Sequence, residues 1–324
     1  MTTYKGIKGF TIQSVASDPT ANTGQVWYNS TTNLLKYSTV TTAGAWSTGG
    51  ALNTSGGDAG SCGIQTAALI FGRHRSGAGG YTANSEQYNG SSWSSTPSLA
   101  TARRNCTGIG TTSAAFCVGG QAGGPNTANV EVWGGSSWSS GTAINTSRRG
   151  LASSASGTTS ANIVFGGIAP PQSAATESWN GSSWSTVPSM STARYTLGGA
   201  GTQPAALAFG GTDPPSGINA TEEWDGSSWS GGGNLGTGRY GCGSAGTQTA
   251  ALCISGGNPS ATTNVEKYNG SSWSNDTVTP TGITKTNGAG TASAALHIGG
   301  LPPSTATFEY DGAGATQVKT ISTS

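Results

Sequence analysis

Tyr88-Asn-Gly-Ser-Ser-Trp93 is the stretch of sequence that decides the fold, because it returns at regular intervals. The same pattern, an aromatic residue, a turn pair, two serines and a tryptophan, ends at four more tryptophans: Trp138, Trp184, Trp229 and Trp273. The five tryptophans are 45, 46, 45 and 44 residues apart. Asn-Gly or Asp-Gly between aromatic segments is a strong β-hairpin signal, since such turns need positive φ. We therefore expect each copy to be the hairpin of one repeated β unit.

A second pattern, a short apolar run that ends in Gly-Gly, lies about 20 residues before each hairpin. Ala114-Ala-Phe-Cys-Val-Gly-Gly120 is typical, and such runs are expected of strands buried on both faces. The glycine pairs are Gly119 and Gly120, Gly166 and Gly167, Gly210 and Gly211, Gly256 and Gly257, and Gly299 and Gly300. In the first copy Arg73 replaces the second glycine. In the fifth, Ser255 reads as an extra residue, for which we expect a bulge.

The two patterns together give about four strands in each repeat, and no segment has helical periodicity with caps. A degenerate sixth copy, Tyr310-Asp-Gly-Ala-Gly-Ala315, lacks the tryptophan, and an isolated Trp46 lies 47 residues before Trp93. Four-stranded units of about 40 to 50 residues stacked around an axis make a propeller. The sequence thus predicts an all-β propeller of six repeat blades. It leaves open whether Trp46 belongs to a separate arm or closes the ring.

Gly-Gly after an apolar strand, then an aromatic residue, then a tryptophan resembles the kelch motif. An arginine four residues after an apolar residue completes the likeness, at Arg103, Arg148, Arg194 and Arg239. The resemblance implies a kelch-like β-propeller in which these arginines lie near the carboxylates that recur two residues before the aromatic position: Glu86, Glu131, Glu177, Glu222 and Glu266. Repetition favours a structural role over acid/base chemistry, or over an arginine cluster that binds an acidic sugar as in sialidases.

The first 45 residues do not follow the repeat. Residues 24–37 read as two strands around the turn Ser30-Thr-Thr-Asn33, and they resemble a hairpin segment of bacteriophage tail-fibre and other virion proteins. We expect an attachment arm over residues 1–45 and a kelch-like propeller over residues 46–324. The alternative is that the arm pairs with the ring as a partial seventh blade.

Composition narrows the function. Only 8% of the 324 residues are charged and the net charge is +1. We therefore expect no surface that follows a phosphate backbone, and hence no nucleic-acid partner. No apolar run reaches the ~18 residues of a membrane helix, and the start lacks the apolar core of a signal peptide. The 10 Trp and 9 Tyr favour a folded chain over a disordered one, although Gly numbers 54.

The candidate chemical groups are few. The five cysteines show no zinc-type spacing. A hairpin centred on Thr111-Thr112 would place Cys106 directly opposite Cys117, and Cys242 and Cys253 repeat this arrangement. A disulfide or two touching thiols would fit, and a reducing cytosol favours thiols. His297 falls inside an apolar strand and reads as a satisfied core residue. We expect no catalytic residue, metal or cofactor, and hence no enzyme.

Ligand contacts are expected in the variable loops after the Gly-Gly strands, because repeated positions build the scaffold. Arg73, His74, Arg75 and Tyr81 form the one charged and aromatic cluster among these loops, and Asp213 lies in another. These residues are either part of a glycan or protein contact or ordinary loop decoration.

The first hypothesis is therefore a non-enzymatic bacteriophage virion protein, a tail fibre, spike or surface-decoration component made in the host cytoplasm. Its arm would join other virion proteins in several copies, and its propeller would bind a host-surface glycan or receptor. A cytoplasmic kelch-type interaction scaffold is the second hypothesis, and a glycan-processing propeller enzyme is the third.

Overall fold

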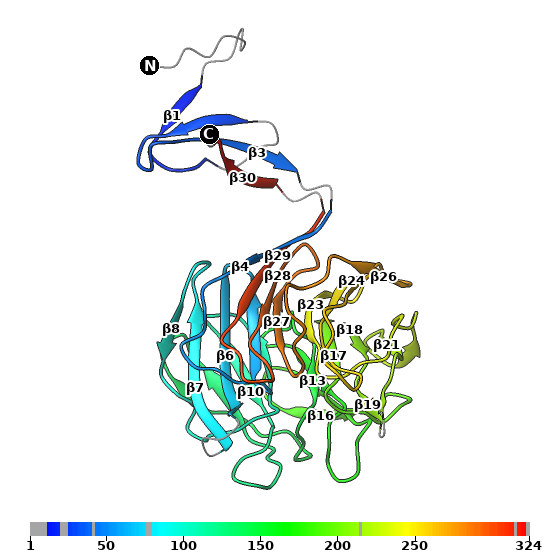
Figure 1. The fold of residues 1–324 in the computed structure, drawn as a ribbon. Helices are drawn as coiled ribbons and strands as arrows, with labels where there is room; N and C mark the ends of the chain where they lie inside the picture. Colours follow the sequence, from blue (N-terminus) through cyan, green and yellow to red (C-terminus); the bar gives the residue numbers. More distant parts are fainter. Residues whose placement is uncertain are drawn as a thin grey trace. The chain divides into compact units, whose positions relative to one another are not determined.

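The computed structural model describes residues 12–19, 25–40, 43–75, 80–213, 216–313 and 316–321, and these contain strands and no helix (Figure 1). The chain divides into two compact units. One, the arm unit, comprises Met1–Ala45 with Asp311–Ser324, and the other, the repeat unit, comprises Trp46–Tyr310. The arm unit thus includes the C-terminal segment that the sequence had placed in the propeller.

The arm unit is built around one four-stranded sheet in the order β1-β2-β3-β30. Its strands are β1 (Gln13–Val15), β2 (Val26–Asn29), β3 (Leu34–Val40) and β30 (Thr316–Thr320). β2 and β3 form the predicted hairpin, and Asn33 in its turn has φ 58°. Asn29 Oδ1 accepts hydrogen bonds from the backbone N–H groups of Thr31 and Thr32, which fixes the turn.

The repeat unit contains six four-stranded antiparallel sheets, numbered here in chain order. The first consists of β5 (Gly60–Ile64), β6 (Ala67–Arg75), β7 (Gly80–Tyr88) and β8 (Trp93–Thr96). The second consists of β9 (Thr107–Gly110), β10 (Ala115–Val118), β11 (Val130–Trp133) and β12 (Trp138–Ser140). The third consists of β13 (Ala152–Ser153), β14 (Asn162–Phe165), β15 (Thr176–Trp179) and β16 (Trp184–Val187).

The other three sheets follow the same plan. The fourth consists of β17 (Gly198–Thr202), β18 (Ala205–Phe209), β21 (Thr221–Trp224) and β22 (Trp229–Gly231). The fifth consists of β23 (Gly243–Thr247), β24 (Ala250–Ile254), β25 (Val265–Tyr268) and β26 (Trp273–Asp276). The sixth consists of β27 (Asn287–Gly290), β28 (Ala294–Ile298), β29 (Thr307–Asp311) and β4 (Ala45–Thr48). A short ribbon, β19 (Thr212–Asp213) with β20 (Ser216–Gly217), follows β18.

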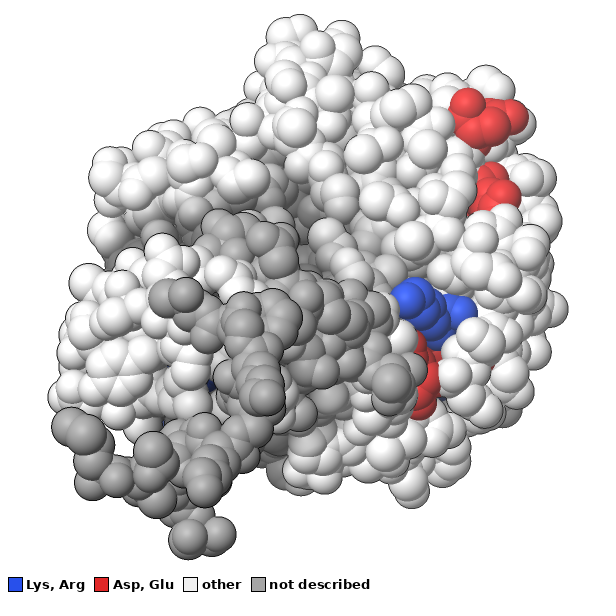
Figure 2. Space-filling view, turned by 90° about the horizontal axis from the view of Figure 1, so that it is seen from above, with Lys and Arg blue, Asp and Glu red and all other residues white. Residues whose placement is uncertain are grey.

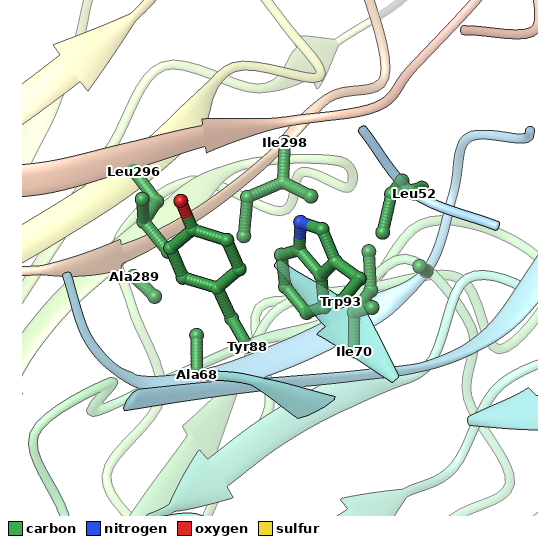
Figure 3. Packing of buried hydrophobic residues seen from close by; sticks show 9 residues of the cluster. Leu52, Ala68, Ile70, Tyr88, Trp93, Ala289, Leu296 and Ile298 are labelled. Atoms are coloured by element: carbon green, nitrogen blue, oxygen red, sulfur yellow. The ribbon is translucent and has the colours of Figure 1, made fainter. Parts of the chain in front are cut away.

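Apolar side chains are buried between the sheets. Six core clusters are found, and each joins two sheets that are consecutive in the chain or, in one case, the sixth sheet to the first. In this last cluster Tyr88 and Trp93 of the first sheet pack on Leu296 and Ile298 of the sixth (Figure 3). The repeated tryptophans therefore serve to bury aromatic surface between neighbouring sheets. The contacts return to their starting sheet, in a propeller-like arrangement.

Inner strands also contact one another in a cycle, β5, β9, β13, β17, β23, β27 and again β5. These strands are rich in Gly, Ala and Ser, and the reason is space. A Cβ on Gly108 of β9 would collide with the backbone of Ser61 on β5, and one on Gly288 of β27 with Ser244 on β23. Small residues thus allow the inner strands to approach closely.

Trp46 supplies the outer strand of the sixth sheet. β4 is the neighbour of β29 in this sheet, and Trp46 packs on Tyr310 with ring centroids 5.0 Å apart. Tyr268 and Trp273 make the same contact at 5.0 Å within the fifth sheet. The Trp46 indole N–H also donates to the Thr277 carbonyl at 2.9 Å. Trp46 therefore takes the place of the tryptophan that the sixth repeat lacks.

The expected bulge at Ser255 is not found. β24 pairs with β25 in continuous register, and Ser255 has φ 58°, close to the 61° of Gly119. Ser255 occupies the place of the first glycine, so that Gly256, and not Gly257, matches Gly120. Its Oγ donates to the Thr262 carbonyl and accepts from the Ile283 N–H at 2.9 Å, which anchors this serine in a conformation that glycine usually adopts.

Candidate functional site

The repeated arginines and glutamates form buried ion pairs, as expected from the resemblance described above. Arg148 Nη2 lies 2.8 Å from Glu177 Oε1, and Arg194 Nη2 lies 3.1 Å from Glu222 Oε1. Arg103 with Glu131 and Arg239 with Glu266 repeat the contact. The second oxygen of each glutamate accepts a backbone N–H, as Glu177 does from Asn145 at 2.6 Å. These charges neutralise one another inside the scaffold and are not available to a ligand.

The first and sixth sheets depart from this scheme in opposite ways. In the first, Gly56 stands at the arginine position, and Arg73 from β6 pairs with Glu86 at 2.7 Å instead. In the sixth, both charges are absent: Ile283 replaces the arginine and Phe308 the glutamate. Pro280, which has no N–H, stands where the other repeats donate to that glutamate. Each of the six sheets of the repeat unit thus has either a complete arginine–glutamate pair or neither of the two charges.

A closed series of backbone hydrogen bonds runs around the inner ends of the sheets. The participating positions, called here the axial ring, are Asp58, Asn105, Gly150, Thr196, Gly241 and Lys285. The N–H of each donates to the carbonyl of the one before it, at 2.6 to 3.1 Å, except that Thr286 N donates to Gly241 O at 3.2 Å in the sixth sheet. All six have φ between 49° and 62°. This shared left-handed conformation points one N–H and one carbonyl of neighbouring sheets at each other.

A cavity of about 440 Å³ opens at the axial ring. Asn105, Gly150, Thr196 and Lys285 of the ring line it, together with Thr212. The remaining wall consists of the side chains one position before the ring, called here the rim: Arg104, Arg149, Tyr195 and Tyr240. A smaller cavity of about 100 Å³, which includes Asp58 and Asn287, shares four ring residues with it.

The rim is held in place by the loops after the Gly-Gly strands. The backbones of Arg104 and Gln121 exchange hydrogen bonds of 3.1 and 2.8 Å, and Tyr195 and Thr212 do the same at 3.3 and 2.8 Å. The segments after these Gly-Gly strands therefore support the rim through their backbones, and Thr212 from one of them lines the cavity. Binding residues held on such a scaffold are the usual arrangement in loop-built sites.

Two rim guanidinium groups have neutral partners. Arg104 Nε donates to Gln121 Oε1 at 3.0 Å, and Arg149 Nη1 donates to Asn126 Oδ1 at 2.8 Å. The Arg104 guanidinium also lies over the Tyr81 ring, 5.1 Å from its centroid. Amides orient these groups without cancelling their charge, unlike the glutamates that neutralise the scaffold arginines.

Lys285 and Asp58 complete the charges at the ring. Lys285 Nζ lies 3.4 Å from Asp58 Oδ2, whose side chain is 2% exposed. Burial raises the pKa of Asp58, and the nearby Lys285 and Arg104 charges act against this rise. Three cations and one carboxylate therefore give the cavity a positive balance. Most of the described residues on the face seen in Figure 2 are, by contrast, uncharged.

The residues predicted as a binding cluster are only partly suited to that role. Arg73 is fully buried and paired with Glu86, so its prediction as a ligand contact is wrong. His74 and Tyr81 are half-buried beside the rim: His74 pairs with Gly57 through the backbone, and Tyr81 contacts Arg104. Arg75 is half-buried at the end of β6, and the side chain of Asp213 lies outside the described part.

Sequence reasoning missed the rim. Arg104, Arg149, Tyr195 and Tyr240 directly follow the repeated arginines, so their fixed position concealed them inside the repeat. The available signal was that this position changes from arginine to tyrosine among the four middle copies, while the residue before it is arginine in all four.

The cysteines lie diagonally and not directly opposite one another. Cys117 pairs with Gly108 and Cys253 with Ser244, because each turn is centred one residue later than expected. All five thiols are free and buried. Burial raises the pKa of Cys117, with the Cys106 thiol hydrogen-bonded to it. The prediction of touching thiols is consistent with this arrangement.

His297 is buried, as predicted, but it is not satisfied. Neither ring nitrogen has a hydrogen-bond partner, and burial lowers its pKa to about 3. The ring packs between aromatic side chains, with centroids 6.1 Å from Trp46 and 5.8 Å from Phe308. It is a neutral core residue next to the Ile283 and Phe308 replacement.

Within the described residues, no three His, Cys, Asp or Glu side chains come close enough to hold a metal ion. The same residues include no helix that is long and apolar enough to span a membrane. No protein-family model matches the chain, and no curated protein matches it either.

Proposed function

We propose that the protein is a non-enzymatic binding component of a virus particle, most closely a bacteriophage tail fibre, spike or surface-decoration protein. Residues 46–310 are proposed to be a six-bladed kelch-like β-propeller that presents the axial cavity to a ligand. The arm unit is proposed to attach the chain to other proteins of the particle.

The propeller proposal is supported by three cycles that run through the same six sheets. Core clusters, inner-strand contacts and the backbone bonds of the axial ring all pass from the sixth sheet back to the first. The kelch likeness is supported by Gly-Gly after the second strand and by the buried arginine–glutamate pairs. β4 then completes the sixth blade.

One observation carries the attachment proposal: the arm unit, although much the smaller, has five of the seven large apolar side chains exposed in the described residues. Val26 and Tyr28 are 39% and 36% exposed and share one face of β2, while Trp27 between them is fully buried. The covered face is fixed by Asp18, which accepts hydrogen bonds from Trp27 at 3.1 Å and Asn29 at 2.7 Å. Grouped exposed apolar side chains are typical of protein contacts.

The experiment is mass spectrometry of purified particles made with full-length variants. Val26→Ser with Tyr28→Ser should keep the chain folded and soluble but reduce its incorporation at least about tenfold. The matched control is Ile64→Ser with Val278→Ser, which removes the two apolar side chains exposed in the repeat unit. Normal incorporation of the arm variant, or absence of the wild-type chain from particles, would contradict the proposal and favour a free interaction scaffold.

A further inference from the structure

The axial cavity has the composition of a site for an acidic sugar. Its volume of about 440 Å³ lies within the ~300–1,000 Å³ range of small-molecule sites. Three cations, Arg104, Arg149 and Lys285, line it together with two tyrosines and several amide or hydroxyl groups, and no carboxylate is among the described residues of its wall. Asp58 lines the adjoining cavity, where its carboxylate lies 3.4 Å from the Lys285 ammonium group.

The anion-binding end is defined by Arg104 and Arg149. The two residues lie just before the inner strands of adjacent sheets, and their next residues are joined by the 2.8 Å bond from Gly150 N to Asn105 O. Each guanidinium uses one N–H on a neutral amide, so donors remain for a ligand. A guanidinium matches the two oxygens of a carboxylate or sulfate, and such charge-assisted bonds are stronger than neutral ones.

The other end is defined by Tyr195 and Tyr240, which come from the next two sheets. A tyrosine offers an apolar ring face together with a polar hydroxyl, which suits a ligand with apolar C–H faces and hydroxyl edges. Thr196 and Thr212 add hydroxyl groups to the same wall. A bare inorganic anion would leave this end unused.

We infer that the axial cavity binds an acidic saccharide, with its carboxylate or sulfate held by Arg104 and Arg149 and a sugar ring against Tyr195 and Tyr240. This inference rests on the proposed display function, for which it names the ligand class. It uses neither the buried scaffold arginines nor the arm unit.

Three probes separate the contributions in calorimetric titrations of the full-length protein: a glucuronate-containing oligosaccharide, its carboxyl-reduced glucose counterpart, and inorganic sulfate. The acidic oligosaccharide should bind at least about tenfold more tightly than either of the others, because a hydrogen bond to a charged group contributes enough for about one decade in Kd. Equal binding of the neutral oligosaccharide, tighter binding of sulfate, or no binding of the acidic oligosaccharide would overturn the inference.

Variants then locate the site. Arg149→Gln should raise the Kd of the acidic oligosaccharide about tenfold or more. Tyr240→Ala should also raise this Kd, and it should not lower the Kd of the neutral counterpart. Lys267→Gln removes one positive charge away from the cavity and should leave Kd unchanged. Arg104→Gln serves as the second charge variant if Arg149→Gln does not fold. An unchanged Kd in a folded arginine variant overturns the site.

Failure here is distinguishable from failure of the proposed function. If the saccharide does not bind while Val26→Ser with Tyr28→Ser still blocks incorporation, the display function stands and the ligand assignment falls. If the saccharide binds but the wild-type chain is absent from particles, the binding site stands and the virion assignment falls.

Discussion

Arg73 Nη1 lies 2.7 Å from Glu86 Oε1, in a pair that restores to the first sheet the two charges found in the next four. Arg73 reaches the carboxylate from β6, whereas the other arginines approach from the segment before their own inner strand. The glutamate therefore requires a buried cation, but not one from a fixed place in the chain. This follows from the cost of an unpaired buried charge.

The sixth sheet shows how the pair can be removed, and this gives the first prediction. Arg239→Ile alone should lower the free energy of unfolding by about 3–5 kcal/mol, because it leaves the Glu266 carboxylate buried without its partner. The triple variant Gly236→Pro, Arg239→Ile and Glu266→Phe copies the sixth sheet and should regain most of that loss. Urea unfolding compares the two. A triple variant no more stable than the single one would show that the three replacements do not act together.

Trp46→Ala should destabilise the repeat unit, because the variant leaves the sixth sheet without its outer tryptophan. We expect a loss of about 2–3 kcal/mol, less than the ~3–5 kcal/mol for a fully buried tryptophan, since Trp46 is only half-buried. Trp46→Phe should lose less stability, because it removes chiefly the hydrogen bond from the indole N–H to the Thr277 carbonyl. Thermal unfolding of both variants provides the measurement, and equal losses would argue against the packing role.

Thr196→Gly should stabilise the protein by about 1 kcal/mol. A β-branched residue at φ 49° is strained, and Gly150 and Gly241 occupy the same ring position in neighbouring sheets. The reverse change, Gly150→Thr, should destabilise it by a similar amount. Chemical denaturation of the two variants tests this relation, which fails if Thr196→Gly is the less stable protein.

His297 should make the protein sensitive to acid. Its pKa is lowered to about 3 by burial, so the unfolded chain binds a proton that the folded chain does not. The contribution of the neutral ring to the free energy of unfolding is therefore complete above pH ~6.5. It decreases by about 1.4 kcal/mol per pH unit as the pH falls from there towards 3. His297→Val, which copies Val164 at the same position, should remove this slope. The free energies of unfolding of the wild-type protein and of His297→Val should be measured from pH 7 to 4. Parallel pH dependences of the two proteins would contradict the prediction.

The cysteines should be unreactive in the folded protein. All five are buried, and burial raises the pKa of Cys62 to about 12. A thiol reagent at pH 8 should therefore label none of them until denaturant is added, when all five should react. Rapid labelling without denaturant, or fewer than five reactive thiols after unfolding, would show that the thiols are accessible or oxidised.

The repeat was readable from the sequence because each of its signals has a local cause. Tyr88-Asn-Gly-Ser-Ser-Trp93 needs a hairpin and the apolar strands need burial on both faces, whereas the arginine–glutamate pairs were expected from the family resemblance. The hairpin and apolar-strand signals recur along the chain and so reinforce one another. The four-stranded sheets follow from them.

What the sequence did not reveal depends on contacts between distant segments. The role of Trp46 rests on a partner strand about 260 residues later, and no local rule connects the two. Ser255 was misread because φ near 58° is expected of glycine, and its side-chain bonds to the Thr262 carbonyl and the Ile283 N–H were not foreseeable. The rim escaped for a related reason: its residues meet only when consecutive sheets turn about an axis.

The strand that contains Trp46 has a consequence for synthesis on the ribosome. β4 leaves the ribosome before any repeat, whereas β29, its partner in the sixth sheet, is the last strand of the six sheets to be made. At about 5–20 residues per second, the 264 residues from Trp46 to Tyr310 take on the order of 10–50 s. During that time β4 is an unpaired strand that must neither aggregate nor pair with an earlier sheet. Its short length and the polar residues Ser47 and Thr48 limit such aggregation and mispairing.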